Sequence, residues 1–308
     1  MSCCYVLGGG LAGLLTAYKT NGILISAEVG GQLAVAKFPL GPRILEETEE
    51  TTALLKELEI YTPPTKFKVG YLERIDLATM YSIISAKIPE GIRDTYFKRT
   101  RGEYARMPDS AMSGNKSCFV GWDMKVIRLT EVLASKVKQV SGRITAITDE
   151  EITILSGQTN VPIRLAKEDK IINTLPLPAF LNLYNKTSPS FYDLLTYDTV
   201  FCLVDWPGFN FKPYSYLYYA NDDQPFHRIN VLGDGSFVLE VRGDRPTNKI
   251  PGLTSTRVLW GCQIVNSIGI SNIGRFLMVG RYAQWEHGIK AQHVLRRVKA
   301  IETEMGAV

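Results

Sequence analysis

Residues 5–18 read Tyr-Val-Leu-Gly-Gly-Gly-Leu-Ala-Gly-Leu-Leu-Thr-Ala-Tyr, and this stretch decides the fold. An apolar strand runs directly into Gly8-x-Gly10-x-x-Gly13, and an apolar helix follows the glycines. A second apolar run then precedes Glu28, which lies twenty positions after Gly8. Strand, glycines, helix, strand and acid therefore occur in the order of a dinucleotide-binding βαβ unit.

Each glycine of this motif has a separate physical role. Gly8 allows a tight turn, Gly10 lets the backbone approach a pyrophosphate, and Gly13 lets the helix pack closely on the strand. The free N–H groups and the positive dipole end at the start of the helix favour bound phosphate. Glu28 is placed to accept hydrogen bonds from a ribose hydroxyl. An ordinary structural turn is the alternative, and the ordered pattern favours the dinucleotide site.

The composition is that of an ordinary globular protein. The chain has 308 residues, of which 45% are hydrophobic and 21% charged, and a net charge of +4. That length allows one large domain or two small ones. The mild positive charge does not by itself indicate nucleic acid.

Cysteine usage and hydropathy set the expected compartment. The five cysteines are scattered, form no C-x-x-C pair, and indicate neither a zinc site nor a disulfide framework. We therefore expect no metal and a reduced, cytoplasmic setting. We also expect no targeting peptide ahead of the first strand and no membrane association, because no apolar run approaches the ~18 residues of a membrane span.

The remaining elements follow from periodicity and composition. The sequence predicts amphipathic helices over 43–59 and 123–137, the latter with Asp123 as its cap, and an arginine-rich helix over about 288–304. Strand patterns cover 143–172, 197–242 and 275–280. The tyrosine cluster at 214–219 alternates like one face of a strand, so its side chains pack in a core or form a pocket wall.

Three further segments carry a family resemblance. They are Gly30-Gly31-Gln32 with the loop to Arg43, the strand 169–173 followed by Thr-Leu-Pro, and Gly280-Arg281 with the residues to Gly288. Together with the glycine motif they resemble the FAD-binding fold shared by flavin amine oxidases, protoporphyrinogen oxidase and UDP-galactopyranose mutase.

The resemblance implies roles for particular residues. In mutase-like proteins an arginine at the position of Arg281 contacts the FAD pyrophosphate, and the positions of Trp285 and His287 lie on the substrate side. The run Pro-Phe-His-Arg-Ile at 225–229 resembles the mutase segment whose arginine, here Arg228, holds a substrate diphosphate. In the related families the loop that corresponds to the one ending at Arg43 passes over the flavin.

Each of these residues could also have an ordinary structural role. Arg281 is otherwise a surface arginine, Trp285 a core residue and Arg228 a salt-bridged strand residue. His287 is a weak catalytic candidate as a proton carrier, because histidine titrates near neutral pH. Its alternative role is structural, as a residue that caps a helix or packs in the core. The residues expected to bind FAD are Gly8, Gly10, Leu11, Ala12, Gly13, Glu28, Gly31, Gln32, Arg43, Gly280, Arg281, Gly288 and Ile289; those expected to bind substrate are Trp285, His287 and Arg228.

The expected fold class is α/β, an FAD-binding Rossmann-like (βαβ) domain with an inserted mixed α+β substrate domain. The FAD-binding domain is expected to be discontinuous, over 1–60, 115–178 and 268–308. The substrate domain is expected over 61–114 and 179–267.

The expected function is that of an FAD-dependent oxidoreductase of the amine-oxidase-like superfamily. The sequence offers no clear side-chain catalyst, so we expect the cofactor to supply the chemistry, by accepting a hydride from the substrate. The substrate is expected to be small or nucleotide-linked. It would be anionic if the arginines line the pocket. One alternative is a non-redox flavoenzyme resembling UDP-galactopyranose mutase. Another is a flavoenzyme acting on an amine carried by nucleic acid, supported by Lys98, Arg99, Arg101 and Arg106. The oligomeric state is left open.

Overall fold

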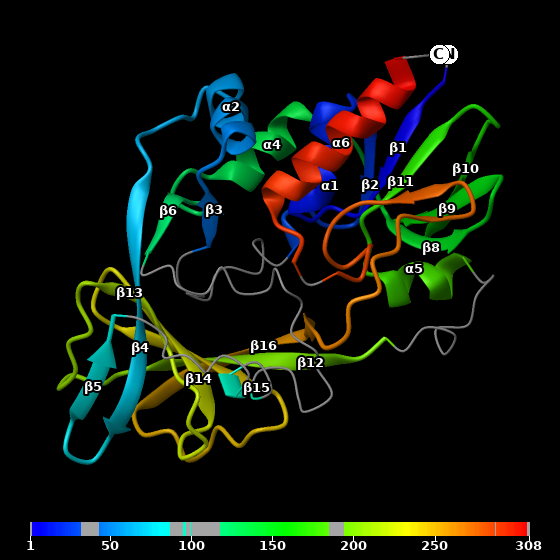
Figure 1. The fold of residues 1–308 in the computed structure, drawn as a ribbon. Helices are drawn as coiled ribbons and strands as arrows, with labels where there is room; N and C mark the ends of the chain where they lie inside the picture. The colour runs from blue at the N-terminus through cyan, green and yellow to red at the C-terminus, as the bar shows by residue number, and fades with distance from the viewer. Residues whose placement is uncertain are drawn as a thin grey trace.

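A six-stranded sheet forms the frame of the upper part of the molecule in Figure 1. The computed structural model describes residues 2–31, 43–86, 95–96, 99, 118–184, 194–286 and 288–306. All neighbours in the sheet are parallel except its first two strands. The strand order is β17 (Asn272–Ile273), β18 (Phe276–Met278), β11 (Lys170–Asn173), β1 (Cys4–Leu7), β2 (Ile23–Ser26) and β7 (Lys138–Ser141).

Helices cover one face of this sheet, and a small sheet covers the other (Figure 1). Leucines and valines on the helices pack against β1 and β2 and form the first core. These helices are α1 (Leu11–Lys19), α2 (Glu49–Glu57), α4 (Leu129–Lys136) and α6 (Ala291–Gly306). The second core lies under the antiparallel strands β8 (Arg143–Ile147), β9 (Glu151–Ser156) and β10 (Thr159–Arg164) and helix α5 (Leu177–Tyr184).

A curled sheet lies below the α/β unit in Figure 1. Its neighbouring strands are antiparallel except for the parallel pair β13 and β4, and β5 (Tyr81–Ser85) adds to β4. Aromatic side chains such as Trp206, Phe211 and Phe237 fill the core on one of its faces. The order is β16 (Leu253–Ile264), β12 (Thr196–Val204), β15 (Phe237–Arg242), β14 (Phe226–Val231), β13 (Tyr214–Tyr218), β4 (Thr65–Asp76), β6 (Cys118–Asp123) and β3 (Ile44–Glu46).

The predicted α/β class is confirmed: a parallel Rossmann-like sheet is joined to a curled antiparallel sheet. The curled sheet includes β3 and β6, which lie within the ranges expected for the FAD-binding domain, so the domain boundaries stay a prediction. No helix in the described part of the chain is long and apolar enough to cross a membrane. Nor do any three His, Cys, Asp or Glu side chains among the described residues gather into a potential metal site.

Two predicted helices begin later than expected. The first residues of the 43–59 segment form strand β3, because they pair with β6, and α2 begins only after Thr48, whose side chain accepts a hydrogen bond from the N–H of Thr51. Asp123 ends strand β6 and does not cap a helix. Its carboxylate accepts hydrogen bonds from the N–H groups of Lys125 and Arg43, which delays α4 to Leu129.

The close contact between α1 and β1 depends on Gly13. A Cβ atom at this position would lie 1.8 Å from the carbonyl oxygen of Gly8. We expect Gly13→Val to lower the free energy of unfolding by about 3 kcal/mol or more, because the helix must move off the turn. Urea unfolding measures this effect. Gly10→Val is the matched control, since a Cβ there meets no atom within 4 Å; equal stability of the two variants would contradict the packing role.

Candidate cofactor and substrate site

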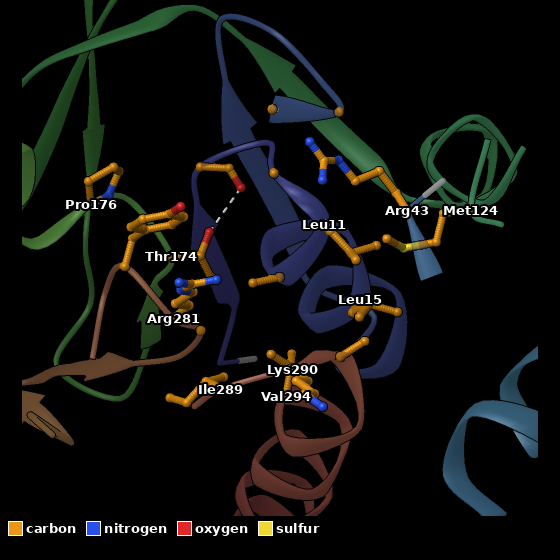
Figure 2. A pocket seen from close by; sticks show the side chains of 18 of the residues that line it. Leu11, Leu15, Arg43, Met124, Thr174, Pro176, Arg281, Ile289, Lys290 and Val294 are labelled. Atoms are coloured by element: carbon orange, nitrogen blue, oxygen red, sulfur yellow. Dashed lines mark hydrogen bonds between the residues drawn. The ribbon is translucent and has the colours of Figure 1, made fainter. Parts of the chain in front are cut away.

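A cavity of about 920 Å³ extends from the glycine turn to the curled sheet. One part of its wall comes from the turn after β1, the loop after β2 and the start of α6. The other part comes from β3 and from strands β13, β14 and β16. Figure 2 shows Thr174 and Arg281 on one side of the start of α1, and Arg43 with Met124 on the other.

The glycine turn presents open backbone to the cavity at Gly10. Its φ of −71° and ψ of 177° suit any residue, and a Cβ there would meet nothing within 4 Å. By contrast, a Cβ at Gly9 would lie 2.1 Å from the carbonyl oxygen of Glu28. Gly10 also caps α1 without any side-chain hydrogen bond. The structure therefore leaves a cradle in front of a helix N-terminus, which suits a diphosphate.

The loop after β2 folds back against this turn. The N–H of Gly30 donates to the carbonyl oxygen of Gly9 at 2.7 Å. Gly31 adopts a φ of +54°, and a Cβ there would lie 3.0 Å from the Cα of Gly10. Glu28 is exposed and lines the cavity at its rim. The predicted ribose-binding acid thus lies next to the cradle.

Thr174 fastens the turn to the neighbouring strand. Its hydroxyl donates to the carbonyl oxygen of Leu7 at 2.7 Å and lies 3.1 Å from that of Gly8. Figure 2 marks the contact with Gly8. Its N–H also donates to the Leu7 carbonyl oxygen at 2.8 Å. The sequence singled out this Thr-x-Pro segment only through the family resemblance. The contacts give it a physical role, since they hold the left-handed turn at Gly8 in place.

The Gly280-Arg281 segment meets the same turn from the other side. Gly280 has a φ of +100°, and a Cβ on it would lie 2.7 Å from the Cβ of Ala12. Arg281 lines the cavity, with its guanidinium 5.7 Å from the centre of the Tyr282 ring. The first residues before and within α6, Ile289 among them, continue the wall. The segment therefore joins the glycine cradle to the rest of the cavity.

Arginines and tyrosines form the wall contributed by the curled sheet. Arg228, Tyr216 and Tyr218 line the cavity, and the guanidinium of Arg228 lies 5.6 Å from the centre of the Tyr216 ring. Arg43 also lines the cavity, 5.3 Å from the centre of the Phe201 ring. Burial raises the pKa of both tyrosine hydroxyls, so they keep their protons at neutral pH.

A buried carboxylate supports the two arginines. Glu240 is only 1% exposed; its Oε1 accepts a hydrogen bond from Arg228 and lies 3.8 Å from Nη1 of Arg43. Asn230 donates to the same oxygen at 3.1 Å. Burial alone would raise the pKa of Glu240, but the charges of Arg228 and Arg43 outweigh it and lower the pKa. One negative charge thus faces two positive charges, and a net positive charge remains at the cavity wall.

Sequence comparisons give no relative for this chain: no protein-family model matches it, and no curated protein does. Solved structures do match. Reduced UDP-galactopyranose mutase has a TM-score of 0.64 at 13% identity, covering 100% of this chain and 96% of that one. A conjugated-linoleic-acid-producing (CLA-producing) fatty acid isomerase from P. acnes has a TM-score of 0.60 at 11% identity, covering 98% of each chain. Aklavinone-11 hydroxylase, solved with FAD and aklavinone, has a TM-score of 0.57 at 12% identity, covering 100% of this chain and 62% of that one.

The chain has the fold of FAD-dependent enzymes. This confirms the predicted resemblance, at identities too low to carry the activity of any one of these proteins over to this chain.

The flavoenzyme fold brings most of the predicted site residues to one cavity. Gly13 and Gly288 are described but are not part of the cavity lining, whereas Gln32 and His287 lie outside the described residues. The predicted site residues that line the cavity are Gly8, Gly10, Leu11, Ala12, Glu28, Gly31, Arg43, Arg228, Gly280, Arg281, Trp285 and Ile289.

For two predicted residues the structure shows both suggested roles at once. Arg228 is salt-bridged to Glu240 and also faces the cavity. Trp285 is buried, as a core residue would be, and yet contributes to the cavity lining. Within the basic run 98–106 the structure describes Arg99 alone, which is buried and donates to the carbonyl oxygen of Phe226 at 2.7 Å. Its guanidinium also lies 3.4 Å from the carboxylate of Asp222, and Arg99 is not part of the cavity lining.

Sequence reasoning missed several residues that line the cavity. Lys290 and Glu46 form an ion pair in its wall; Lys290 directly precedes α6 and Glu46 ends β3, far apart in the chain. The alternation of Tyr216 and Tyr218 indicated a shared face but not which one. No local signal indicated Trp260 or the buried carboxylate of Glu240, because both depend on how strands pair.

The buried histidine beside Glu240 makes stability depend on pH. Burial lowers the pKa of His227 to about 3, and its Nε2 lies 3.9 Å from Oε2 of Glu240. In the unfolded chain histidine titrates at about 6.5. Between these values the unfolded state binds the extra proton, so stability falls as the pH is lowered, by about 1.4 kcal/mol per pH unit for this group.

We expect His227→Phe to flatten this dependence between pH 6.5 and 4.5. Thermal unfolding of the wild type and the variant across that range measures it. Parallel curves for the two proteins would show that His227 is not held neutral in the folded state.

Proposed function

We propose that this chain is an FAD-dependent oxidoreductase of the amine-oxidase-like superfamily, acting on a small or nucleotide-linked substrate with an anionic group. The observation that carries the proposal is one cavity that joins the open cradle at Gly10 to the positively charged wall at Arg43 and Arg228. Such a cavity suits a dinucleotide at one end and an anionic substrate at the other.

The residues present fit FAD. The cradle in front of Gly10 and the N-terminus of α1 would hold the pyrophosphate, and Glu28 would accept hydrogen bonds from the adenosine ribose. The turn at Gly280 and Arg281 and the residues before α6 would hold the remainder. Bound FAD would supply the acceptor for a hydride from the substrate.

The chain's own residues would bind and orient the substrate. A guanidinium can bind phosphate through two parallel hydrogen bonds, and Glu240 fixes the position from which Arg228 would do so. Tyr216 and Tyr218 keep their hydroxyl protons and can donate hydrogen bonds to the same group. His287 stays the weak candidate for a proton carrier, and the cytoplasmic location stays a prediction.

A non-redox reaction like that of UDP-galactopyranose mutase is the second candidate. Arg228 within the cavity favours it, because that arginine belongs to the segment that resembles the mutase, whose solved structure matches this chain over its whole length. Reoxidation of the reduced protein by oxygen separates an oxidase from a mutase or a dehydrogenase, because an oxidase is reoxidised rapidly. An amine carried by nucleic acid is a weaker third alternative, since Arg99 is buried and does not line the cavity.

We expect the purified protein to be yellow and to release FAD on denaturation. Gly10→Val should fold normally and lose FAD, because its added methyl groups would occupy the space required by the pyrophosphate. Absorbance of the protein and of the denatured supernatant measures FAD content, and circular dichroism checks the fold. A folded Gly10→Val protein that keeps its FAD would contradict the placement of the pyrophosphate.

We expect Arg281→Ala and a change at Arg228 to act on different ligands. Arg281→Ala should weaken FAD binding tenfold to a hundredfold, corresponding to about 1.5–3 kcal/mol for a charge-assisted contact with phosphate. Arg228→Lys keeps a positive charge beside the buried Glu240 but loses the planar fork, so it should weaken pyrophosphate binding and leave FAD bound. Calorimetric titration with FAD and with pyrophosphate measures the two affinities. An equal loss of FAD affinity in the Arg281 and Arg228 variants would contradict the assignment of the two arginines to different ligands.

A further inference from the structure

Trp260 is the exception among the tryptophans of this protein. Its side chain is 78% exposed, whereas Trp122, Trp206 and Trp285 are 2%, 3% and 2% exposed. The sequence contains four tryptophans, so Trp260 is the only one at the surface. Exposed apolar area costs free energy in proportion to its size, and an indole ring has a large one. Trp260 also lines the cavity, beside Leu259.

An irregularity of strand β16 places both residues at the cavity. Thr199 on β12 pairs with Leu259, but Tyr197 pairs with Gln263, so residues 260–262 lie opposite Asp198 alone. In a regular strand, consecutive side chains such as those of Leu259 and Trp260 point to opposite faces. A bulge removes this restriction and redirects a side chain, and bulges are frequent at sheet edges and next to active sites. β16 is an edge strand of the curled sheet.

The positions of Trp260 and Arg228 define the length of ligand that could touch both. Their strands, β16 and β14, are separated by β12 and β15 (Figure 1). Three strand spacings amount to about 14 Å. A ring joined to a phosphate group by a linker, as in a nucleoside diphosphate, is long enough to extend along this wall and contact both side chains at once.

We infer that Trp260 is a specificity-determining residue, whose indole stacks on the flat ring of the substrate while Arg228 and Arg43 bind its anionic group. The inference deepens the proposed function and rests on it, since it takes this cavity as the substrate site. It assigns the substrate two parts, a planar ring at the mouth and a negative charge inside. Stacking on the ring would offset the cost of exposing Trp260 in the free protein.

Calorimetric titration of the FAD-loaded protein with UDP and with inorganic pyrophosphate tests this inference. UDP carries both a ring and phosphates, and pyrophosphate carries the charge alone. Trp260→Ala should weaken UDP binding roughly tenfold to a hundredfold, as for loss of one base–aromatic stack, and leave pyrophosphate binding unchanged. Trp260→Phe should keep most of the UDP affinity. Tyr81→Ala is the matched control, because Tyr81 is 52% exposed on β5 and is not part of the cavity lining.

The fluorescence of the wild type gives a second readout. Since Trp260 is the surface tryptophan, acrylamide quenching reports mainly on its ring. UDP should protect it from acrylamide, and pyrophosphate should not.

Three results would overturn the inference: UDP binding no tighter than pyrophosphate in the wild type, equal loss of both ligands in Trp260→Ala, or loss of FAD or an altered flavin spectrum in that variant. The last would mean that Trp260 contacts the cofactor. A protein that takes up no FAD would instead refute the proposed function. The UDP and pyrophosphate titrations of FAD-free Gly10→Val protein, whose cofactor cradle is blocked, would still report on Trp260.

Discussion

The close approach of α1 to the end of β1 is the constraint on which the rest of the structure depends. Gly13 lies against the carbonyl of Gly8, so the helix starts immediately beside the sheet, and Gly10, Leu11 and Ala12 line the cavity. Thr174, directly after β11, and Gly280, after β18, contact the same turn. Because three separate parts of the chain converge on this turn, the site exists only when the whole sheet has formed.

A second constraint lies in the curled sheet, where a single buried carboxylate supports two arginines. Breaking a buried ion pair by removing one partner destabilises a protein strongly, and replacing the whole pair with apolar residues is often neutral or favourable. The cluster around Glu240 is therefore not explained by its contribution to stability. Its effect on the site is to hold Arg228 and Arg43 at fixed positions, with a net positive charge. His227 stays neutral beside it and does not add to that charge.

Local patterns predicted what is local in this fold. The glycine motif, the second strand and Gly280 were readable because each needs particular residues at a particular turn. The strand at Ile44–Glu46 was missed, since its acid-rich continuation imitates a helix and its partner β6 lies more than seventy residues away. Asp123 was assigned as a helix cap, because a carboxylate that ends a strand and one that begins a helix look alike in sequence. Glu240 and Trp260 had no signal at all, since strand pairing and a bulge determine where they lie.

The two ends of the cavity differ in a way that bears on how the protein would recognise its substrate. The wall at Arg43 and Arg228 is preorganised: its guanidiniums are already held by Glu240, so binding an anion requires little rearrangement of side chains. Trp260, in contrast, is exposed on an edge strand and gains contacts only when a ring covers it. Charge would thus attract many small anions, and only a ligand long enough to reach the indole would gain the additional affinity. Selectivity in such a site comes from the weaker, exposed contact and not from the stronger, buried one.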